Sequence, residues 1–105
     1  MISAIKKLLG IGPSLSVEEL LKEGATVVDV RSKGEYAGGH VRGSINIPLD
    51  QLSANLHKLK EKDKAIVTCC ASGMRSASGA AILRRAGYTR VANGGPWTSV
   101  RNKMK

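Results

Sequence analysis

A cysteine at the start of a short segment of mostly small residues is the part of this chain best suited to chemistry. The segment is Cys70-Ala71-Ser72-Gly73-Met74-Arg75-Ser76. The apolar run 65–69 before it predicts a short buried strand, and residues 77–87 after it predict a helix. A thiolate is stabilised at such a junction, because loop N–H groups and the positive end of the helix dipole favour a negative sulfur. We therefore expect Cys70 to be a nucleophile that can also hold an anion.

The residues that follow Cys70 distinguish it from an ordinary buried cysteine. Most free cysteines are structural thiols that pack in a core. Gly73 permits a positive φ or the close approach of an anion, and Ser76 can cap the helix that follows. A structural cysteine needs neither residue, so the pattern favours a functional thiol.

The sequence offers Cys70 no obvious general base and no metal-binding partner. His40 and His57 are not evident partners, which disfavours a Cys–His dyad. Two adjacent cysteines lack the usual spacing of a metal site, so we expect no metal and no cofactor. Activation of the thiolate must then come from the loop amides, the helix N-terminus and Arg75. The same amides can stabilise a persulfide anion, so transfer of a sulfur atom does not require a general base.

The neighbouring Cys69 is expected on the same strand as Cys70, with its side chain on the opposite face of the sheet. The two thiols therefore cannot form a disulfide without distortion. Two adjacent cysteines that do not form a disulfide are typical of a protein in a reducing compartment, which we take to be the cytoplasm. We interpret Cys69 as a buried strand residue, because a role in releasing sulfide from a persulfide would demand a local rearrangement.

The composition fits one small globular domain. A chain of 105 residues has no room for a second core, and 42% hydrophobic residues is ordinary for a globular protein. The net charge of +9 attracts small anions. No recognition helix, RNA-binding signature or row of stacking aromatics accompanies it. We therefore interpret the charge as solvated surface, and expect a monomer without a nucleic-acid partner.

A basic, amphipathic N-terminal segment, residues 1–12, precedes the expected domain at 13–105. The segment is short and is interrupted by Lys6 and Lys7, so it predicts neither a signal peptide nor a transmembrane span. We expect it to pack on the domain or to fray. Weak contact of residues 1–9 with an anionic membrane surface is the alternative.

Short apolar strands alternate with helical segments along the chain. Strands are expected at 26–30, 45–47, 65–69 and 90–92, and helices at 17–23, 49–59, 77–87 and 97–104. Residues 32–40 are expected to form a loop with at most two helical turns. This alternation predicts an α/β fold with a mainly parallel sheet covered on both faces. Ligands bind such sheets at the carboxyl ends of the strands, where the Cys70 segment lies.

Four sequence blocks, in order, resemble the single-domain rhodanese-like sulfurtransferases from Leu15 to the C-terminus. They are 28–31 with Glu35-Tyr36, 39–48, 70–76, and Gly94-Gly95 with Trp97. The chain departs from the family pattern at Pro96, because the family usually has further residues between the glycines and the tryptophan. The resemblance implies a three-layer fold whose central sheet has about five short strands.

The resemblance also implies roles for individual residues. Cys70 would be the nucleophile that carries the sulfur, and the substrate or persulfide would be bound by Ala71, Ser72, Gly73, Met74, Arg75 and Ser76. Arg75 could bind the substrate or brace the loop through an ion pair, and the sequence leaves both open. The neighbouring loops would be held by hydrogen bonds and ion pairs of Asp29, Arg31, Glu35 and His40. We expect His57 to be solvated.

The implied activity is transfer of a sulfane sulfur from a donor such as thiosulfate to cyanide or a thiol through a Cys70 persulfide. Polysulfide, glutathione persulfide and a protein persulfide are further candidate donors. The alternatives are a sulfur-relay carrier and a binding module, either acting on a partner protein. A phosphatase is a further rival, because some phosphatases share this fold. Their loops follow C-x5-R, one residue longer than the Cys70–Arg75 spacing, and the smaller cradle suits sulfur better.

Overall fold

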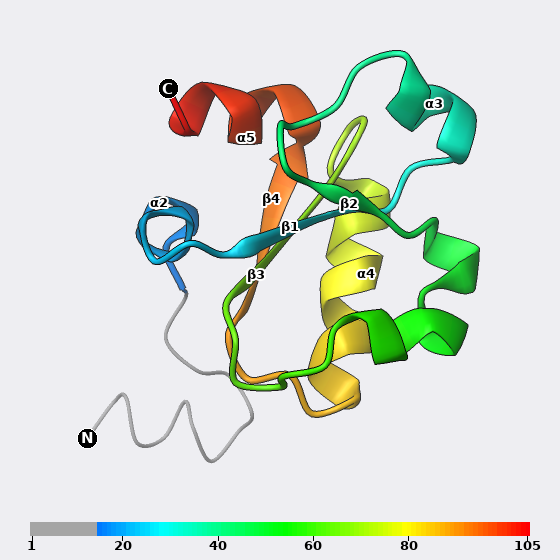
Figure 1. Cartoon of the computed structure of the whole chain (residues 1–105), viewed down its shortest axis with the longest axis vertical. Coiled ribbons are helices and arrows are strands. Elements are labelled where there is room, and N and C mark those ends of the chain that lie inside the picture. Colours follow the sequence, from blue (N-terminus) through cyan, green and yellow to red (C-terminus); the bar gives the residue numbers. More distant parts are fainter. Residues whose placement is uncertain (1–14) are drawn as a thin grey trace.

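The computed structural model of the chain describes residues 15–105 (Figure 1). Its centre is a four-stranded sheet in the order β2-β1-β3-β4, and every neighbouring pair of strands is parallel. The strands are β1 (Thr26–Asp29), β2 (Ile45–Asn46), β3 (Ile66–Cys70) and β4 (Val91–Pro96). The parallel α/β fold is therefore confirmed. The described residues contain fewer than the roughly five strands expected, because only the four apolar runs pair in the sheet.

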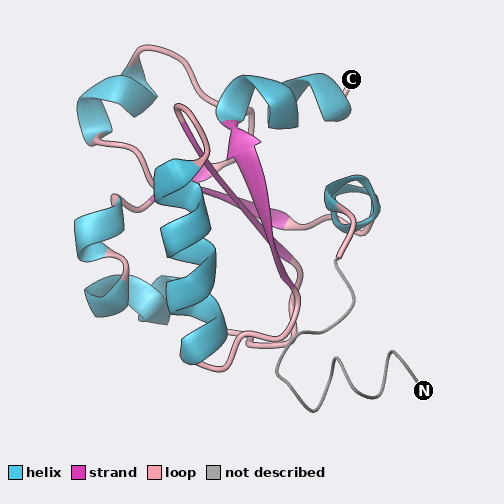
Figure 2. Ribbon diagram, turned by 180° about the vertical axis from the view of Figure 1, so that it is seen from behind, coloured by secondary structure: helices cyan, strands magenta, loops and turns pink. Residues whose placement is uncertain are grey.

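Helices cover both faces of the sheet, which gives three layers (Figure 2). The α-helices are α2 (Val17–Lys22), α3 (Lys33–Ala37), α4 (Met74–Arg85) and α5 (Trp97–Lys103). One apolar cluster joins the sheet to α4 and includes Val28, Ile66 and Leu83, and the other joins it to α2 and α5 and includes Leu20 and Val100. The smaller helix α3 lies beyond the carboxyl ends of the strands (Figure 1).

Both short helices near the amino end of the chain begin at a serine cap. The Ser16 hydroxyl accepts a hydrogen bond from the Glu19 N–H at 3.2 Å. Ser32 and Glu35 form a complete capping box, in which each side chain accepts a bond from the other residue's N–H, at 3.2 and 3.0 Å. These bonds satisfy N–H groups that a helix start leaves without partners. The capping box explains why the expected loop 32–40 contains a helix.

Residues 49–59 differ from the expected continuous helix. They form two 3-10 segments, η1 (Leu49–Gln51) and η2 (Ser53–Lys58), and Asn55 within the second has non-helical backbone angles. The Asn55 side chain donates to the Gln51 carbonyl at 2.7 Å. Such local bonds from side chain to backbone compete with α-helical pairing. The apolar spacing is still used, since Leu52 and Leu59 are buried in the core.

Two boundaries near the Cys70 segment differ from the expectation. Helix α4 begins at Met74, so Gly73 occupies the cap position and Ser76 lies in the first turn. The expectation that Ser76 caps the helix is therefore wrong. Strand β4 continues to Pro96 instead of ending at residue 92, and α5 follows at once.

The expected N-terminal segment 1–12, with its membrane contact through residues 1–9, lies outside the described residues. Within residues 15–105, the helices are all too short or too polar to cross a bilayer.

Gly94 lets β4 pass through the most crowded point near the sheet's carboxyl end. A Cβ placed there would lie 2.6 Å from a methyl of Val100, 2.7 Å from a methyl of Val67 and 2.8 Å from the Thr68 carbonyl oxygen. Real Cβ atoms do not approach other atoms so closely, and the backbone carbonyl of β3 cannot move without disturbing the sheet. Only glycine fits the packing of β4 between β3 and α5.

Replacing Gly94 by alanine should destabilise the fold. We expect the Gly94→Ala variant to lose about 1–3 kcal/mol of unfolding free energy, because a methyl group is forced into a filled core. Urea denaturation followed by circular dichroism measures this loss. Gly34→Ala in α3 is the matched control, because a Cβ at Gly34 meets no atom within 4 Å. Equal stability of the two variants would contradict the packing argument.

Candidate active site

The structure places Cys70 where the sequence predicts a nucleophile. Cys70 is the last residue of β3, and the loop that follows it leads directly into α4 (Figure 1). Gly73 in this loop has a φ of 104°, a left-handed conformation that other residues rarely adopt. A Cβ at Gly73 would lie 3.5 Å from the Cα of Gly95, so the loop packs closely on β4. The expected positive φ of Gly73 is confirmed.

Hydrogen bonds from its own loop hold the Cys70 sulfur. The Gly73 N–H donates to Sγ at 2.9 Å, and the Ser76 hydroxyl lies 3.3 Å from Sγ. In this bond the Cys70 thiol donates to the Ser76 oxygen, while the Ser76 hydroxyl donates to the Gly73 carbonyl at 3.1 Å. When the thiol ionises, the hydroxyl can rotate to donate to Sγ instead. The sulfur, the loop glycine and the first turn of α4 therefore form one connected unit.

Residues of the sheet fix this unit from outside. The Thr68 hydroxyl donates to the Ser76 carbonyl at 2.8 Å. The Asn93 side chain donates to the Gly73 carbonyl at 3.4 Å and accepts from the Gly95 N–H at 2.9 Å. Sequence reasoning missed Thr68 and Asn93. The available signals were a polar residue within the apolar run of β3 and an asparagine just before the glycine pair.

The environment of Cys70 favours its thiolate. Burial raises the pKa of the thiol, but hydrogen bonds oppose this effect. The Ser76 hydroxyl contributes most, followed by the N–H groups of Ser76, Gly73 and Ser72, and the net result is a lowered pKa. Hydrogen-bond donors of the loop and the first turn of α4 thus lower the pKa of the Cys70 thiol, and no general base is needed for this effect.

Cys69 lies in an environment of the opposite kind. It is buried on the α2–α5 face of the sheet, whereas Cys70 belongs to the core on the α4 face. Burial and the nearby Asp29 carboxylate raise the pKa of Cys69 to about 12. Both thiols are free. The predicted opposite orientation is confirmed, and Cys69 stays protonated at neutral pH.

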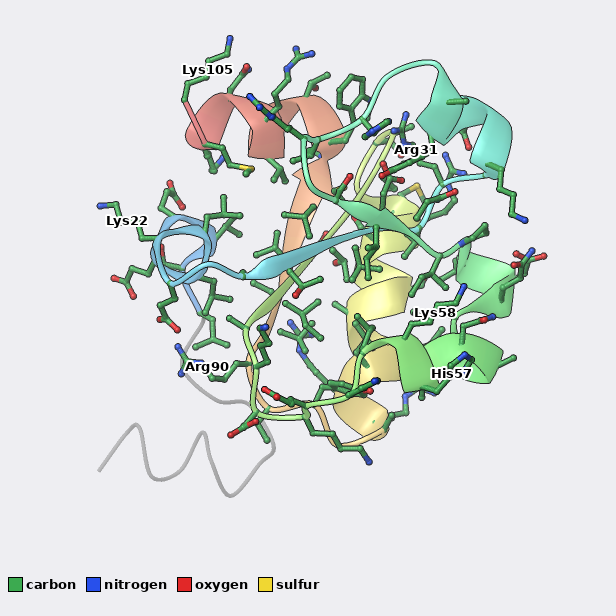
Figure 3. The ribbon with its side chains drawn as sticks, viewed as in Figure 1. Lys22, Arg31, His57, Lys58, Arg90 and Lys105 are labelled. Carbon is green, nitrogen blue, oxygen red and sulfur yellow. The ribbon has the colours of Figure 1, made fainter. Side chains whose placement is uncertain are left out.

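Arg31 holds together the segments beside the Cys70 loop, and lies at the carboxyl end of the sheet (Figure 3). Its guanidinium makes a buried ion pair with Asp29, with Nη2 2.7 Å from Oδ2 and Nε 3.0 Å from Oδ1. It also donates to the carbonyls of Glu35 at 3.3 Å and Gly39 at 2.7 Å. A buried ion pair is tolerated when its remaining donors are satisfied in this way.

The departure from the family pattern at Pro96 leaves Trp97 well packed. The Trp97 ring lies 4.9 Å from the guanidinium carbon of Arg31 and 4.9 Å from that of Arg101. Two cations over one indole give favourable cation–π contacts. Trp97 therefore joins α5 to the same arginine that holds the loop after β1.

Arg75, in the first turn of α4, forms an ion pair with Glu35 of α3. Its Nη1 donates to Glu35 Oε1 at 2.7 Å and its Nη2 to Oε2 at 2.9 Å. The Arg75 bond, followed by the Ser32 N–H, lowers the pKa of Glu35 to about 2. The pair is partly open to solvent, with side chains 39% and 38% exposed. Arg75 thus braces the loop in this structure.

The other residues singled out in the sequence lie on the surface near Cys70, in the loop after α3, or far from the site. Ala71 and Ser72 are exposed on the loop, and Met74, the first residue of α4, is 79% exposed. His40 stacks on Tyr36 and bonds its carbonyl, so it is part of the loop after α3. His57 lies on the exposed side of η2, far from the site (Figure 3).

Two further findings concern chemistry in the described residues. Within 15–105, no three side chains of histidine, cysteine, aspartate or glutamate gather in a way that could hold a metal ion. A cavity of about 250 Å³ lies beside the amino ends of β1 and β3, between Thr26, Ile66 and lysines of η2 and the turn after it. It is at the opposite end of the sheet from Cys70 and contains no nucleophile.

Comparison with known proteins assigns the chain to a family. The model of the family described as Rhodanese-like domain matches residues 15–95. YqhL of Bacillus subtilis is 38% identical over 69 residues, which cover 66% of this chain and 54% of YqhL. The thiosulfate sulfurtransferase PspE of Escherichia coli is 35% identical over 69 residues, covering 65% of this chain and 66% of PspE. The chain spans about half the length of curated relatives such as YqhL.

A solved structure matches over most of the chain. The human single-domain sulfurtransferase TSTD1 is 26% identical with a TM-score of 0.70, covering 90% of this chain and 100% of that one.

Removing the Ser76 hydroxyl should raise the pKa of Cys70. A hydrogen bond to a charged group is worth enough to move the pKa by about 1 unit. We expect the pH midpoint of iodoacetamide alkylation to rise by about that amount in Ser76→Ala. Ser72→Ala is the matched control, because Ser72 acts on the sulfur only through its backbone N–H. An unchanged pH midpoint in Ser76→Ala would show that the Ser76 hydroxyl does not lower the pKa of Cys70.

Cys69 should resist the same reagent in the folded protein. With a pKa of about 12 and a buried side chain, it presents almost no thiolate at neutral pH. We expect Cys70→Ser to remain unlabelled at pH 8 until denaturant is added, as measured by mass spectrometry. Rapid labelling of this folded variant would contradict the burial of Cys69.

Proposed function

Because the chain belongs to the rhodanese-like family, we propose that it is a sulfurtransferase that uses a persulfide on Cys70. It would take a sulfane sulfur from a donor such as thiosulfate and pass it to a thiophilic acceptor, either cyanide or a thiol. The observation that carries this proposal is the hydrogen bond from the Gly73 N–H to Cys70 Sγ at 2.9 Å, within a loop that lowers the pKa of that thiol.

The first half-reaction loads the enzyme. The Cys70 thiolate attacks the outer sulfur of thiosulfate, a Cys70–sulfur bond forms, the sulfur–sulfur bond of thiosulfate breaks, and sulfite leaves with the bond's electron pair. The negative charge moves to the outer sulfur of the persulfide. The N–H groups of Gly73, Ser72 and Ser76 are suited to stabilise it there, as they stabilise the thiolate.

The second half-reaction restores the thiolate. Cyanide or a thiolate attacks the outer sulfur, and Cys70 leaves with the electron pair, giving thiocyanate or a new persulfide. Neither half-reaction transfers a proton to carbon or cleaves a bond that needs an acid, so the absence of a histidine base at Cys70 is no obstacle.

Access to the sulfur depends on the exposed part of the loop. Cys70 is 0% exposed, whereas the flanking Ala71, Ser72 and Met74 face solvent. We infer that these residues line the route of the donor and move aside as it enters. Arg75, held by Glu35, supports the loop in this proposal and does not bind the donor directly.

Two free cysteines suit a reducing setting such as the cytoplasm. A thiol acceptor is abundant there, and a protein thiol could replace a small one. The exposed Met74 beside Cys70 would give an apolar contact for such a partner. A carrier and an enzyme share the Cys70 persulfide, and multiple turnovers with a small thiol distinguish the enzyme.

Incubation with thiosulfate should add one sulfur atom to the protein, because the thiolate is formed and its adduct is stabilised. Intact-protein mass spectrometry measures the addition, and subsequent cyanide should remove it as thiocyanate. We expect Cys69→Ser to accept the sulfur like wild type and Cys70→Ser to accept none.

Loading of Cys70→Ser, or hydrolysis of an aryl phosphate by a wild-type protein that takes no sulfur from any sulfane donor, would overturn the proposal.

A further inference from the structure

The charges next to the Cys70 loop cancel in pairs. Arg75 is the only charged side chain in the segment 70–76. Both arms of its guanidinium are engaged by the two carboxylate oxygens of Glu35, at 2.7 and 2.9 Å. Arg31, the next arginine, is buried against Asp29. The sulfur is therefore surrounded by neutral N–H and hydroxyl donors, without a free cation from these two pairs.

Glu35 holds its position independently of Arg75. Its Oε1 accepts the Ser32 N–H at 3.0 Å in the capping box of α3, and its own carbonyl accepts from Arg31 at 3.3 Å. Glu35 is thus held in place by its own helix cap, and the longer Arg75 side chain extends to pair with it. A bidentate arginine–carboxylate pair has a defined geometry that holds the guanidinium in one direction.

The neutrality of this cradle affects sulfur donors unequally. Thiosulfate is a dianion, and its leaving group sulfite is also a dianion, so both gain from a free cation near the loop. A thiol hydropersulfide, R–S–SH, carries no such oxyanion, and its leaving group is a monoanionic thiolate, R–S⁻. A free guanidinium would therefore favour thiosulfate, and a neutralised one removes that advantage.

We propose that Glu35 is a specificity-determining positioning residue, which pairs with Arg75 and so shifts the preference of the site from thiosulfate toward hydropersulfides of small thiols. This inference rests on the proposed sulfurtransferase function. Glu35 acts through Arg75 and does not itself touch the sulfur.

The favoured loading reaction balances without an added reagent. The Cys70 thiolate attacks the outer sulfur of R–S–SH, the Cys70–sulfur bond forms, and the donor's sulfur–sulfur bond breaks. The thiolate R–S⁻ leaves with the electron pair and takes up the proton of the new Cys70 persulfide. The products are a thiol and the persulfide anion, so a single sulfur atom is exchanged between two thiols.

The Glu35→Gln variant separates charge from structure. Glutamine also serves in a capping box, so α3 keeps its cap while the negative charge is lost. The readout is the ratio of kcat/KM for thiosulfate to kcat/KM for the hydropersulfide of mercaptoethanol at pH 7. Wild-type Glu35 is fully charged at this pH, since its pKa is about 2. We expect the ratio to rise about fivefold, the effect of one exposed unit charge at short range, and to fall back in high salt.

Variants of Arg75 complete a charge cycle. Arg75→Gln leaves Glu35 unpaired, so the ratio should fall about fivefold below wild type. The double variant Glu35→Gln/Arg75→Gln is neutral again, and its ratio should return to near the wild-type value. If the ion pair has only a structural role, both single variants and the double variant lose activity equally with the two donors. The ratio of kcat/KM then stays unchanged, which would contradict the proposal.

A distant glutamate provides the matched control. Glu23 makes a similar exposed pair with Arg90, both contacts at 2.7 Å, and Arg90 lies at the other end of the sheet from Arg31 (Figure 3). Glu23→Gln changes the net charge by the same amount, and should leave the donor ratio unchanged. An equal rise in Glu23→Gln would assign the effect to overall charge and overturn the role of Glu35.

The proposed function and this inference fail in different ways. If wild type takes no sulfur from either donor, the sulfurtransferase proposal is lost. If it takes sulfur from both but Glu35→Gln leaves their ratio unchanged, only the specificity role of Glu35 is lost.

Discussion

A buried arginine organises the end of the molecule where the candidate chemistry takes place. Arg31 is 4% exposed and Asp29 0%, so neither charge has water to solvate it. Burial is acceptable because Asp29 accepts from the guanidinium and from the Arg31 N–H, while Arg31 also reaches the carbonyls of Glu35 and Gly39. Asn46 closes the arrangement by donating to the carbonyls of Asp29 and Arg31. These bonds hold strands β1 and β2 and helix α3 in fixed positions relative to one another.

The position of α3 in turn sets the electrostatics of the Cys70 loop. Glu35 comes from α3, and its pair with Arg75 joins the segment after β1 to the start of α4. The sulfur is then left to backbone N–H groups and the Ser76 hydroxyl, which lower its pKa despite its burial. Neutral donors fixed in place stabilise a thiolate or persulfide without attracting every anion strongly. The hydrogen bonds to the Cys70 sulfur and the ion pair of Arg75 thus belong to separate parts of one network.

Close packing of the backbone provides the other support for the site. Gly94 lets β4 approach β3 at a distance that excludes any Cβ, and Gly73 with Gly95 lets the Cys70 loop rest on β4. Asn93 ties the same two segments together through its side chain. The loop is therefore supported by the sheet beneath it, which explains how a seven-residue segment can hold a buried sulfur in a defined orientation.

The sequence alone determined the features that depend on local patterns. The apolar runs predicted the four strands, the pattern of residues 17–23 predicted the helix α2, and the strand–loop–helix junction singled out Cys70. The alternation of side chains along a strand predicted that Cys69 faces the other side of the sheet. It did not predict the capping box of α3, the 3-10 form of residues 49–59 or the start of α4 at Met74. In these places side-chain bonds and packing outweigh periodicity.

Only the tertiary structure decided the partner of Arg75. Glu35 is separated from Arg75 by 40 positions in the chain, and nothing in local spacing tells whether the guanidinium faces the substrate or a carboxylate. Assembly of the parallel sheet brings α3 beside the start of α4, and Coulomb attraction at 2.7 Å then settles the direction of the side chain. The sequence singled out Cys70 as the candidate nucleophile because the groups that lower its pKa lie in its own loop, whereas the pairing of the charges beside it depends on contacts made across the fold.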